Sequence, residues 1–94
     1  MDNAKLYLNN RFYCYKYEIK DFSEKLKTNS SLTSLNLESN KFKDEEIYYL
    51  SEALKVNTYV TSLNLSFNNI DDDEMKTLTD ALKVNSSLTE IKFK

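Results

Sequence analysis

Apolar residues recur along the chain in a fixed pattern, L-x-x-L-x-L-x-x-N-x-φ, where φ is apolar. The pattern occurs twice, at Leu32, Leu35, Leu37, Asn40 and Phe42, and at Val60, Leu63, Leu65, Asn68 and Ile70. Residues two apart in an extended chain point to the same side, so each copy predicts a short strand with buried leucines. The polar residues between and after the leucines then face the other way: Ser34, Asn36, Glu38, Ser62, Asn64 and Ser66.

A helical pattern follows each predicted strand. Apolar residues at helical spacing form two stripes, Ile47, Leu50, Ala53 and Leu54, then Met75, Leu78, Ala81 and Leu82. Asp44 and Asp72 are the predicted N-caps, with further acidic residues in the first turn. Asn57 and Asn85 follow the helices, where we expect a left-handed residue, because a chain without glycine relies on asparagine for that conformation.

Strand and helix together form a unit that repeats every 28 residues, at Asn29, Asn57 and Asn85. The predicted units are residues 29–56, residues 57–84 and an incomplete third at 85–94. The third supplies Leu88, Ile91 and Phe93 to the inner side and Glu90 and Lys92 to the outer side. A fixed period in the twenties with leucines at fixed offsets is typical of a stacked solenoid.

Residues 1–28 keep the pattern only in part. Ile19, Phe22 and Leu26 align with Ile47, Leu50 and Leu54, and apolar residues at helical spacing continue back to Leu8. We predict an N-terminal helical cap, or degenerate half repeat, formed by one long helix. A short strand at residues 12–17 is the alternative, because that run is aromatic and β-prone.

Composition removes several classes of function. The chain has 94 residues, no histidine, no glycine and one cysteine, Cys14. The absence of histidine and glycine argues against imidazole-based catalysis, imidazole metal ligands and glycine-rich phosphate loops, so we expect no enzyme activity and no cofactor or metal. A net charge of −2 argues against nucleic acid as a partner, and the hydropathy pattern against a membrane span. The lone cysteine fits a reducing compartment, either the cytosol or the nucleus, and we expect a cytoplasmic location. The acidic run at residues 71–74 is interpreted as helix capping and not as a calcium site.

The pattern through Asn68, Ile70, Asp72, Leu78, Ala81 and Leu82 resembles the ribonuclease-inhibitor type of leucine-rich repeat. The resemblance implies an α/β solenoid, with parallel strands on a concave side and helices on a convex side. It also implies that Asn40 and Asn68 form an asparagine ladder that bonds to buried loop backbone. Members bind ribonucleases, GTPases, actin and other proteins, so the resemblance specifies a fold and leaves the partner open.

We therefore expect a non-enzymatic protein-interaction module. The predicted partner-binding surface is the concave face, made of Ser34, Asn36, Glu38, Ser62, Asn64, Ser66, Glu90 and Lys92. Leu88, Ile91 and Phe93 are predicted to form a self-association edge, most simply in a homodimer. The alternatives are a structural fragment, or a designed or truncated repeat unit, without its own binding function, and, by family analogy only, a regulator of a GTPase or of actin.

Aromatic residues outside the predicted core leave one further question open. Tyr48, Tyr49, Tyr59 and Phe67 are either exposed, as a sticky surface, or partly buried beneath neighbouring units.

Overall fold

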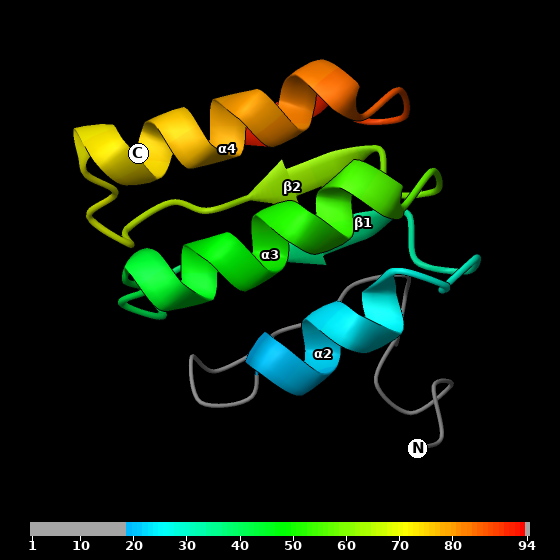
Figure 1. Ribbon diagram of the computed structural model, residues 1–94, viewed down its shortest axis with the longest axis horizontal. Helices are drawn as coiled ribbons and strands as arrows, with labels where there is room; N and C mark the ends of the chain where they lie inside the picture. Colours follow the sequence, from blue (N-terminus) through cyan, green and yellow to red (C-terminus); the bar gives the residue numbers. More distant parts are fainter. Residues whose placement is uncertain (1–18, 94) are drawn as a thin grey trace.

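The computed structural model describes residues 19–93 (Figure 1). Its elements alternate along the chain: α2 (Ile19–Leu26), β1 (Ser34–Asn36), α3 (Asp44–Val56), β2 (Ser62–Asn64), α4 (Asp72–Val84) and β3 (Glu90–Lys92). Within this range the domain is mixed α/β, with three helices and three strands. None of the described helices is long and apolar enough to cross a membrane.

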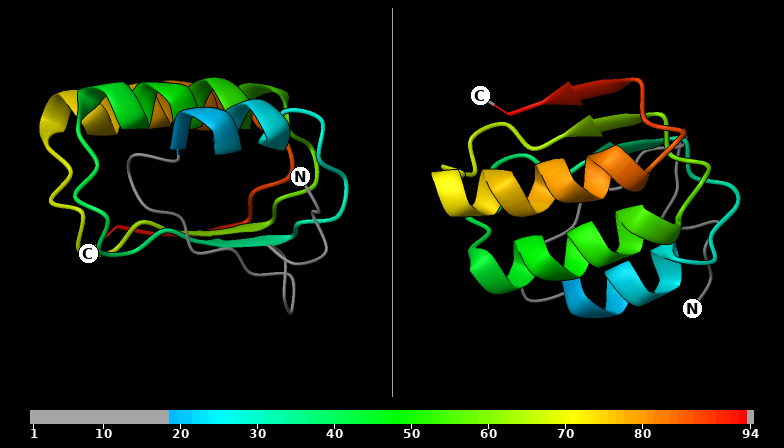
Figure 2. Two further views of the ribbon diagram at one scale, coloured as in Figure 1. Left: turned by 90° about the horizontal axis from the view of Figure 1, so that it is seen from below. Right: turned by 45° about the horizontal axis from the view of Figure 1, so that its top comes forward.

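The three strands form one parallel sheet in the order β1-β2-β3. Ser34 pairs with Ser62 and Ser62 with Glu90, so partners are 28 residues apart in the sequence. The helices form a layer on one side of this sheet, as the two views of Figure 2 show. Each helix returns the chain to the start of the next strand, which is the connection that parallel strands require.

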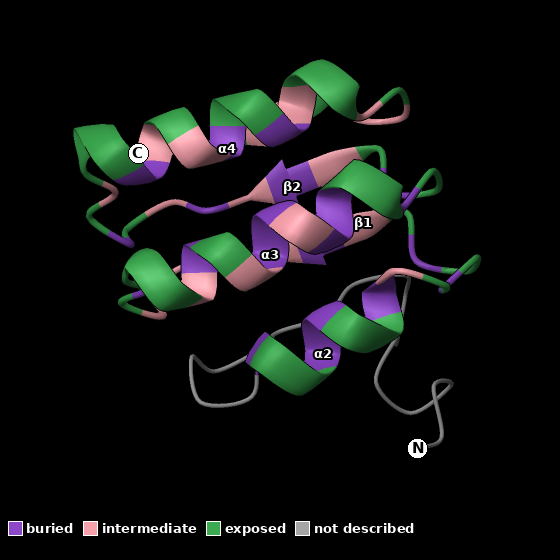
Figure 3. Ribbon diagram, in the orientation of Figure 1, coloured by how far each residue is buried: buried purple, intermediate pink, exposed green. Residues whose placement is uncertain are grey.

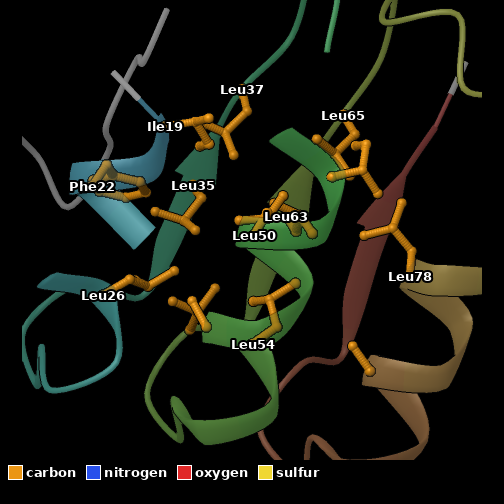
Figure 4. Packing of buried hydrophobic residues seen from close by; sticks show 14 of the residues in the cluster. Ile19, Phe22, Leu26, Leu35, Leu37, Leu50, Leu54, Leu63, Leu65 and Leu78 are labelled. Carbon is orange, nitrogen blue, oxygen red and sulfur yellow. The ribbon is translucent and has the colours of Figure 1, made fainter. Parts of the chain in front are cut away.

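The core fills the space between the two layers. Leu35, Leu37, Leu63 and Leu65 leave the sheet toward the helices and are almost fully buried. They pack against Ile19, Phe22, Leu26, Leu50, Leu54 and Leu78 (Figure 4). The alternating leucines of the strands thus pack against the apolar stripes of the helices, as the sequence predicts.

Helices α3 and α4 differ in how completely their apolar residues are buried. Leu50 and Leu54 on α3 are fully buried, whereas Met75 and Leu82 on α4 are half-buried (Figure 3). Helix α3 packs extensively against both α2 and α4, whereas the extensive helix contact of α4 is with α3. The same hydrophobic stripe is therefore covered more completely on the central helix.

The predicted N-caps are wrong by one residue. Asp44 and Asp72 are the first helical residues, and the caps are Lys43 and Asp71. The Asp71 carboxylate accepts a hydrogen bond from the Glu74 N–H at 2.8 Å, and the Asp71 N–H donates to the Glu74 carboxylate at 3.0 Å. This reciprocal pair occupies Asp71 and Glu74, and so fixes the helix start one residue earlier.

The prediction that Asn57 and Asn85 adopt the left-handed conformation is also wrong. Asn57 and Asn85 are extended, with φ of −68° and −69°. The left-handed residues are Ser39, Lys41, Phe67 and Asn69, which lie in the turns after β1 and β2. Asn57 and Asn85 are extended because their side chains bond to backbone ahead of and behind them, as described below. The N-terminal predictions before Ile19, including the long helix, its strand alternative and Cys14, lie outside the described residues.

Candidate protein-binding surface

The sheet brings the predicted polar surface residues into rows. Ser34, Ser62 and Glu90 are neighbours across the three strands, and Asn36, Asn64 and Lys92 form the next row. Glu38 and Ser66 follow in the turns after β1 and β2, where the Ser39 N–H bonds to the Ser66 carbonyl at 3.0 Å. The side chains on β1 and β2 are half-buried, and Glu90 and Lys92 are exposed. We call these eight residues the strand face.

Hydrogen bonds within the strand face hold several of its side chains in place. The Asn36 amide donates to the Glu38 carboxylate at 3.2 Å and accepts from the Glu38 N–H at 3.2 Å. The Ser62 hydroxyl bonds to the Glu90 carboxylate at 3.1 Å. A partner would therefore meet a small, polar and largely pre-ordered surface, which lowers the entropy lost on binding.

A buried asparagine connects the turns after β1 and β2. The Asn68 amide donates to the carbonyls of Leu37 at 2.9 Å and Leu65 at 3.0 Å. Its oxygen accepts from the Asn40 N–H at 2.8 Å and from the Phe42 N–H at 3.4 Å. The Asn40 amide donates to the Leu37 carbonyl at 3.0 Å. Each short amide thus satisfies backbone groups that the turns leave unpaired.

A second set of asparagines, Asn29, Asn57 and Asn85, does the same at the other end of the strands. The Asn57 amide donates to the Leu26 carbonyl at 2.8 Å, and its oxygen accepts from the Val60 N–H at 2.9 Å. Asn85 repeats this with the Leu54 carbonyl and the Leu88 N–H, both at 2.8 Å. Sequence reasoning missed this role, although the 28-residue recurrence of these asparagines was its signal.

Three carboxyl groups meet where α3 and α4 begin. Oxygens of Asp44, Asp71 and Glu74 lie within 4.8 Å of one another, and Glu74 is only 4% exposed. Burial raises the pKa of the Glu74 carboxyl, and the neighbouring Asp44 raises it further, while the bond from the Asp71 backbone opposes the rise. The capping bonds between Asp71 and Glu74 account for the position of this cluster. The sequence predicts acidic residues at the helix starts, and it does not predict that Glu74 is buried.

The raised pKa of Glu74 gives a pH prediction. The folded chain holds this proton more tightly than the unfolded chain, so stability will fall as pH rises from the ordinary value of 4.5 through the raised pKa. Glu74→Gln keeps the oxygen that accepts from Asp71 and imitates the protonated acid. We expect this variant to melt at a higher temperature at pH 7 and to lose that part of the pH dependence.

Thermal melts of the parent and of Glu74→Gln from pH 4 to pH 8 measure both effects, with the exposed Asp73→Asn as control. If the melting temperatures of the parent and of Glu74→Gln change in parallel with pH, the prediction is wrong.

The aromatic residues outside the core divide between exposed and half-buried. Phe67 is 71% exposed, Tyr48 54% and Tyr59 49%. Tyr49 is half-buried, makes an edge contact with Tyr48 at 6.0 Å and lies beneath the Lys20 ammonium at 5.8 Å. Phe67 is notable because it is both exposed and left-handed, with φ of 62°. A bulky side chain in that conformation costs about 1–2 kcal/mol.

Of the predicted self-association residues, Ile91 lies in β3, and Leu88 and Phe93 lie on either side of it. Leu88, Ile91 and Phe93 are half-buried and pack against the core from one side. Shallow recesses adjoin them, one lined by Ser66, Ile91, Lys92 and Phe93 and another by Phe67, Asn69, Ile70 and Phe93. Apolar side chains at this edge of the described sheet are therefore partly exposed.

The parallel strands, the inward leucines and the bonded asparagines define a leucine-rich domain. The chain belongs to the TMOD/LMOD leucine-rich domain family, which it matches over residues 2–94. The family match supports a leucine-rich domain and does not distinguish the ribonuclease-inhibitor type. No curated protein matches the chain.

Two solved structures are similar to it. One is Leiomodin-1 Actin-Binding Site 2, at 29% identity and a TM-score of 0.78, covering 85% of this chain and 46% of that one. The other is the tropomodulin C-terminal domain of Caenorhabditis elegans, at 20% identity and a TM-score of 0.72, covering 82% of this chain and 47% of that one; this likeness shows the fold alone. The chain spans less than half the length of either structure.

Proposed function

We propose that this chain is a non-enzymatic, cytoplasmic protein-binding module whose partner is actin. The observation that carries the proposal is the 29% identity to Leiomodin-1 Actin-Binding Site 2 over 85% of this chain. Membership of the TMOD/LMOD leucine-rich domain family supports it. The described polar side chains cap helices, bond to turn backbone or lie on the surface. These roles are consistent with a protein that binds a partner.

The strand face is the proposed contact surface. Its side chains are in register across three strands, and hydrogen bonds already order several of them. Ser62 and Asn64 lie on the central strand, so a partner that covers the face must pass over them. Central positions of an interface carry most of its binding energy.

The test is binding to actin, as filaments in co-sedimentation and as monomers in gel filtration. Arginines at Ser62 and Asn64 will obstruct the centre of the strand face, and we expect Ser62→Arg/Asn64→Arg to bind at least about tenfold more weakly. Lys76→Arg/Asp80→Arg on the exposed side of α4 is the matched control and should bind like the parent. If the parent binds neither form of actin, the proposal is wrong, and the alternative of a structural unit without its own binding function gains support. If the control loses as much as the test variant, the strand face is the wrong surface.

Phe67 is the proposed apolar anchor beside the strand face. A left-handed, exposed phenylalanine lowers stability without filling the core, and its apolar ring is free to contact a partner. We expect Phe67→Asn to raise the free energy of unfolding by about 1 kcal/mol, because asparagine tolerates this conformation. The same variant should bind actin about tenfold more weakly, because exposed aromatic anchors dominate interfaces. Urea unfolding and co-sedimentation measure the two effects; a gain in stability with unchanged binding removes Phe67 from the interface.

We further propose that units 29–56, 57–84 and 85–94 stack as a solenoid of the ribonuclease-inhibitor type, with residues 1–28 as its N-terminal cap and the strand face on its concave side. The 28-residue register between strands and the two sets of asparagines support this arrangement. Each unit then buries its leucines only against its neighbours, as solenoid repeats do.

Self-association through Leu88, Ile91 and Phe93 is a second proposed property, compatible with actin binding through the strand face. Its support is that these three apolar side chains pack against the core and remain only partly buried. An isologous homodimer is the simplest form of such an association.

A further inference from the structure

An exposed apolar patch lies where the helices end and the chain turns toward the strands. Val56 and Val84 are the last residues of α3 and α4 and are 55% and 62% exposed, and Tyr59, just beyond α3, is 49% exposed. The three helices end on the same side of the molecule (Figure 1). Helix α3 is the central one, so described neighbours flank Val56 and Tyr59 on both sides. We call Val56, Tyr59 and Val84 the end patch.

Asparagine side chains hold the helix ends in line beneath the end patch. The Asn85 amide donates to the Asn57 carbonyl at 2.9 Å, and the Asn57 amide donates to the Asn29 carbonyl at 3.2 Å. Val56 and Val84 immediately precede Asn57 and Asn85, so they are neighbours across two packed helices. Packed helices lie about 8–10 Å apart, and the exposed valines therefore repeat at about this spacing.

The chain is basic around the end patch. Four lysines and no acidic residue occur in the last helical turns and the connections that follow them, at residues 25–33, 53–61 and 81–89. The Lys27 ammonium bonds to Glu24 at 2.9 Å. The Lys55 ammonium bonds to Glu52 at 2.8 Å. Ion pairs at the surface contribute little to stability, so carboxylates of a partner can compete for these lysines.

We propose that the end patch and its lysines bind an acidic amphipathic helix of a partner protein, which crosses the ends of α3 and α4. Charge complementarity selects an acidic partner. The opposite ends of these helices repel it, because residues 38–46 and 66–74 contain eight acidic residues. This surface is a second one besides the strand face, and it does not depend on actin being the partner there.

The spacing of the valines selects a helix over an extended segment. On a partner helix, residues seven apart lie on one side and about 10.5 Å apart, close to the spacing of Val56 and Val84. On an extended segment, residues on one side recur about every 6.6–6.8 Å, and neither one nor two such steps match. A partner helix with apolar residues at i, i+3 or i+4, and i+7 therefore fits the end patch.

A matched pair of designed peptides tests the proposal, each constrained to be helical by a side-chain crosslink. One carries leucines at i, i+3 and i+7 flanked by glutamates, and the other carries lysines in place of the glutamates. We expect the glutamate peptide to bind with a dissociation constant below about 1 mM, and the lysine peptide to bind at least about tenfold more weakly. The glutamate peptide should shift the amide NMR signals of residues 55–59 and 83–87.

Variants of the chain separate charge from apolar contact. Lys83 and Lys76 are both exposed on α4, and Lys83 alone of the two lies in its last turn. We expect Lys83→Glu to weaken binding of the glutamate peptide about fivefold, and Lys76→Glu to change it less than about twofold. Val56→Ser/Val84→Ser should weaken it about tenfold, because the leucines lose their apolar contacts. All four side chains are exposed, so circular dichroism should show an unchanged fold.

Three results would overturn the inference. The first is that the glutamate peptide does not bind up to about 1 mM, or binds no better than the lysine peptide. The second is that the shifted NMR signals lie on the strand face and not at the helix ends. The third is that Lys76→Glu weakens binding as much as Lys83→Glu, which would show that net charge and not the end patch attracts the peptide.

Discussion

Asn68→Ala will destabilise the domain by about 4 kcal/mol, a large part of the 5–15 kcal/mol that holds a typical small protein folded. Asn68 is 1% exposed, and its amide satisfies the carbonyls of Leu37 and Leu65 and the N–H of Asn40. Alanine removes the Asn68 partners of the Leu65 carbonyl and the Asn40 N–H, at a cost of about 1–3 kcal/mol each, whereas the Leu37 carbonyl keeps its bond from the Asn40 amide. Urea unfolding followed by circular dichroism measures the loss.

Asn40→Ala is the matched control for this prediction. Asn40 occupies the equivalent sequence position, but it is half-buried and its amide donates only to Leu37 and Glu38 just before it. We expect a loss of about 1 kcal/mol, typical of a partly exposed hydrogen bond. Equal urea midpoints for the two variants would mean that the bonds between neighbouring turns do not stabilise the fold.

Leu54→Ala will cost about 3 kcal/mol, and Leu82→Ala clearly less, although the two leucines occupy equivalent positions 28 residues apart. Leu54 is fully buried on the central helix, so its removal leaves a cavity as well as losing apolar burial. Leu82 is half-buried on α4, where solvent can fill the space that the smaller side chain leaves. Thermal and urea unfolding of both variants measure the difference. Equal losses would show that α4 is covered as completely as α3, against the burial described above.

The regular part of this fold follows from short-range patterns. The alternating leucines predict β1 and β2, and the helical spacing of apolar residues predicts α3 and α4. Both predictions hold because the leucine side of the strands packs against the apolar stripes of the helices. The details that the pattern did not predict involve competition between groups. Asn57 and Asn85 were expected to be left-handed, but they are extended, and their amides donate to carbonyls of the preceding unit. Asp71 takes the cap from Asp72 because Glu74 is three residues beyond it.

The sequence predicts which face of the sheet is polar, and it does not predict which partner binds there. Alternation along the strands places Ser62 and Asn64 opposite the buried leucines, as the sheet register requires. Their small polar side chains carry no charge or motif that selects one protein over another. Family analogy offers actin only as one of several partners, and the proposal of actin rests on the likeness to Leiomodin-1 Actin-Binding Site 2. The exposure and left-handed backbone of Phe67 depend on the turn that Asn68 holds, so they needed the three-dimensional structure.

The most direct test of actin binding through the strand face is amide hydrogen exchange of the 94-residue chain with and without actin. We predict that actin will slow exchange in residues 34–38, 62–66 and 90–92, and will leave the exposed turns of α3 and α4 unchanged. Protection confined to the helices would assign binding to the opposite layer. Unchanged exchange throughout, at actin concentrations that saturate a micromolar site, would contradict the proposed function itself.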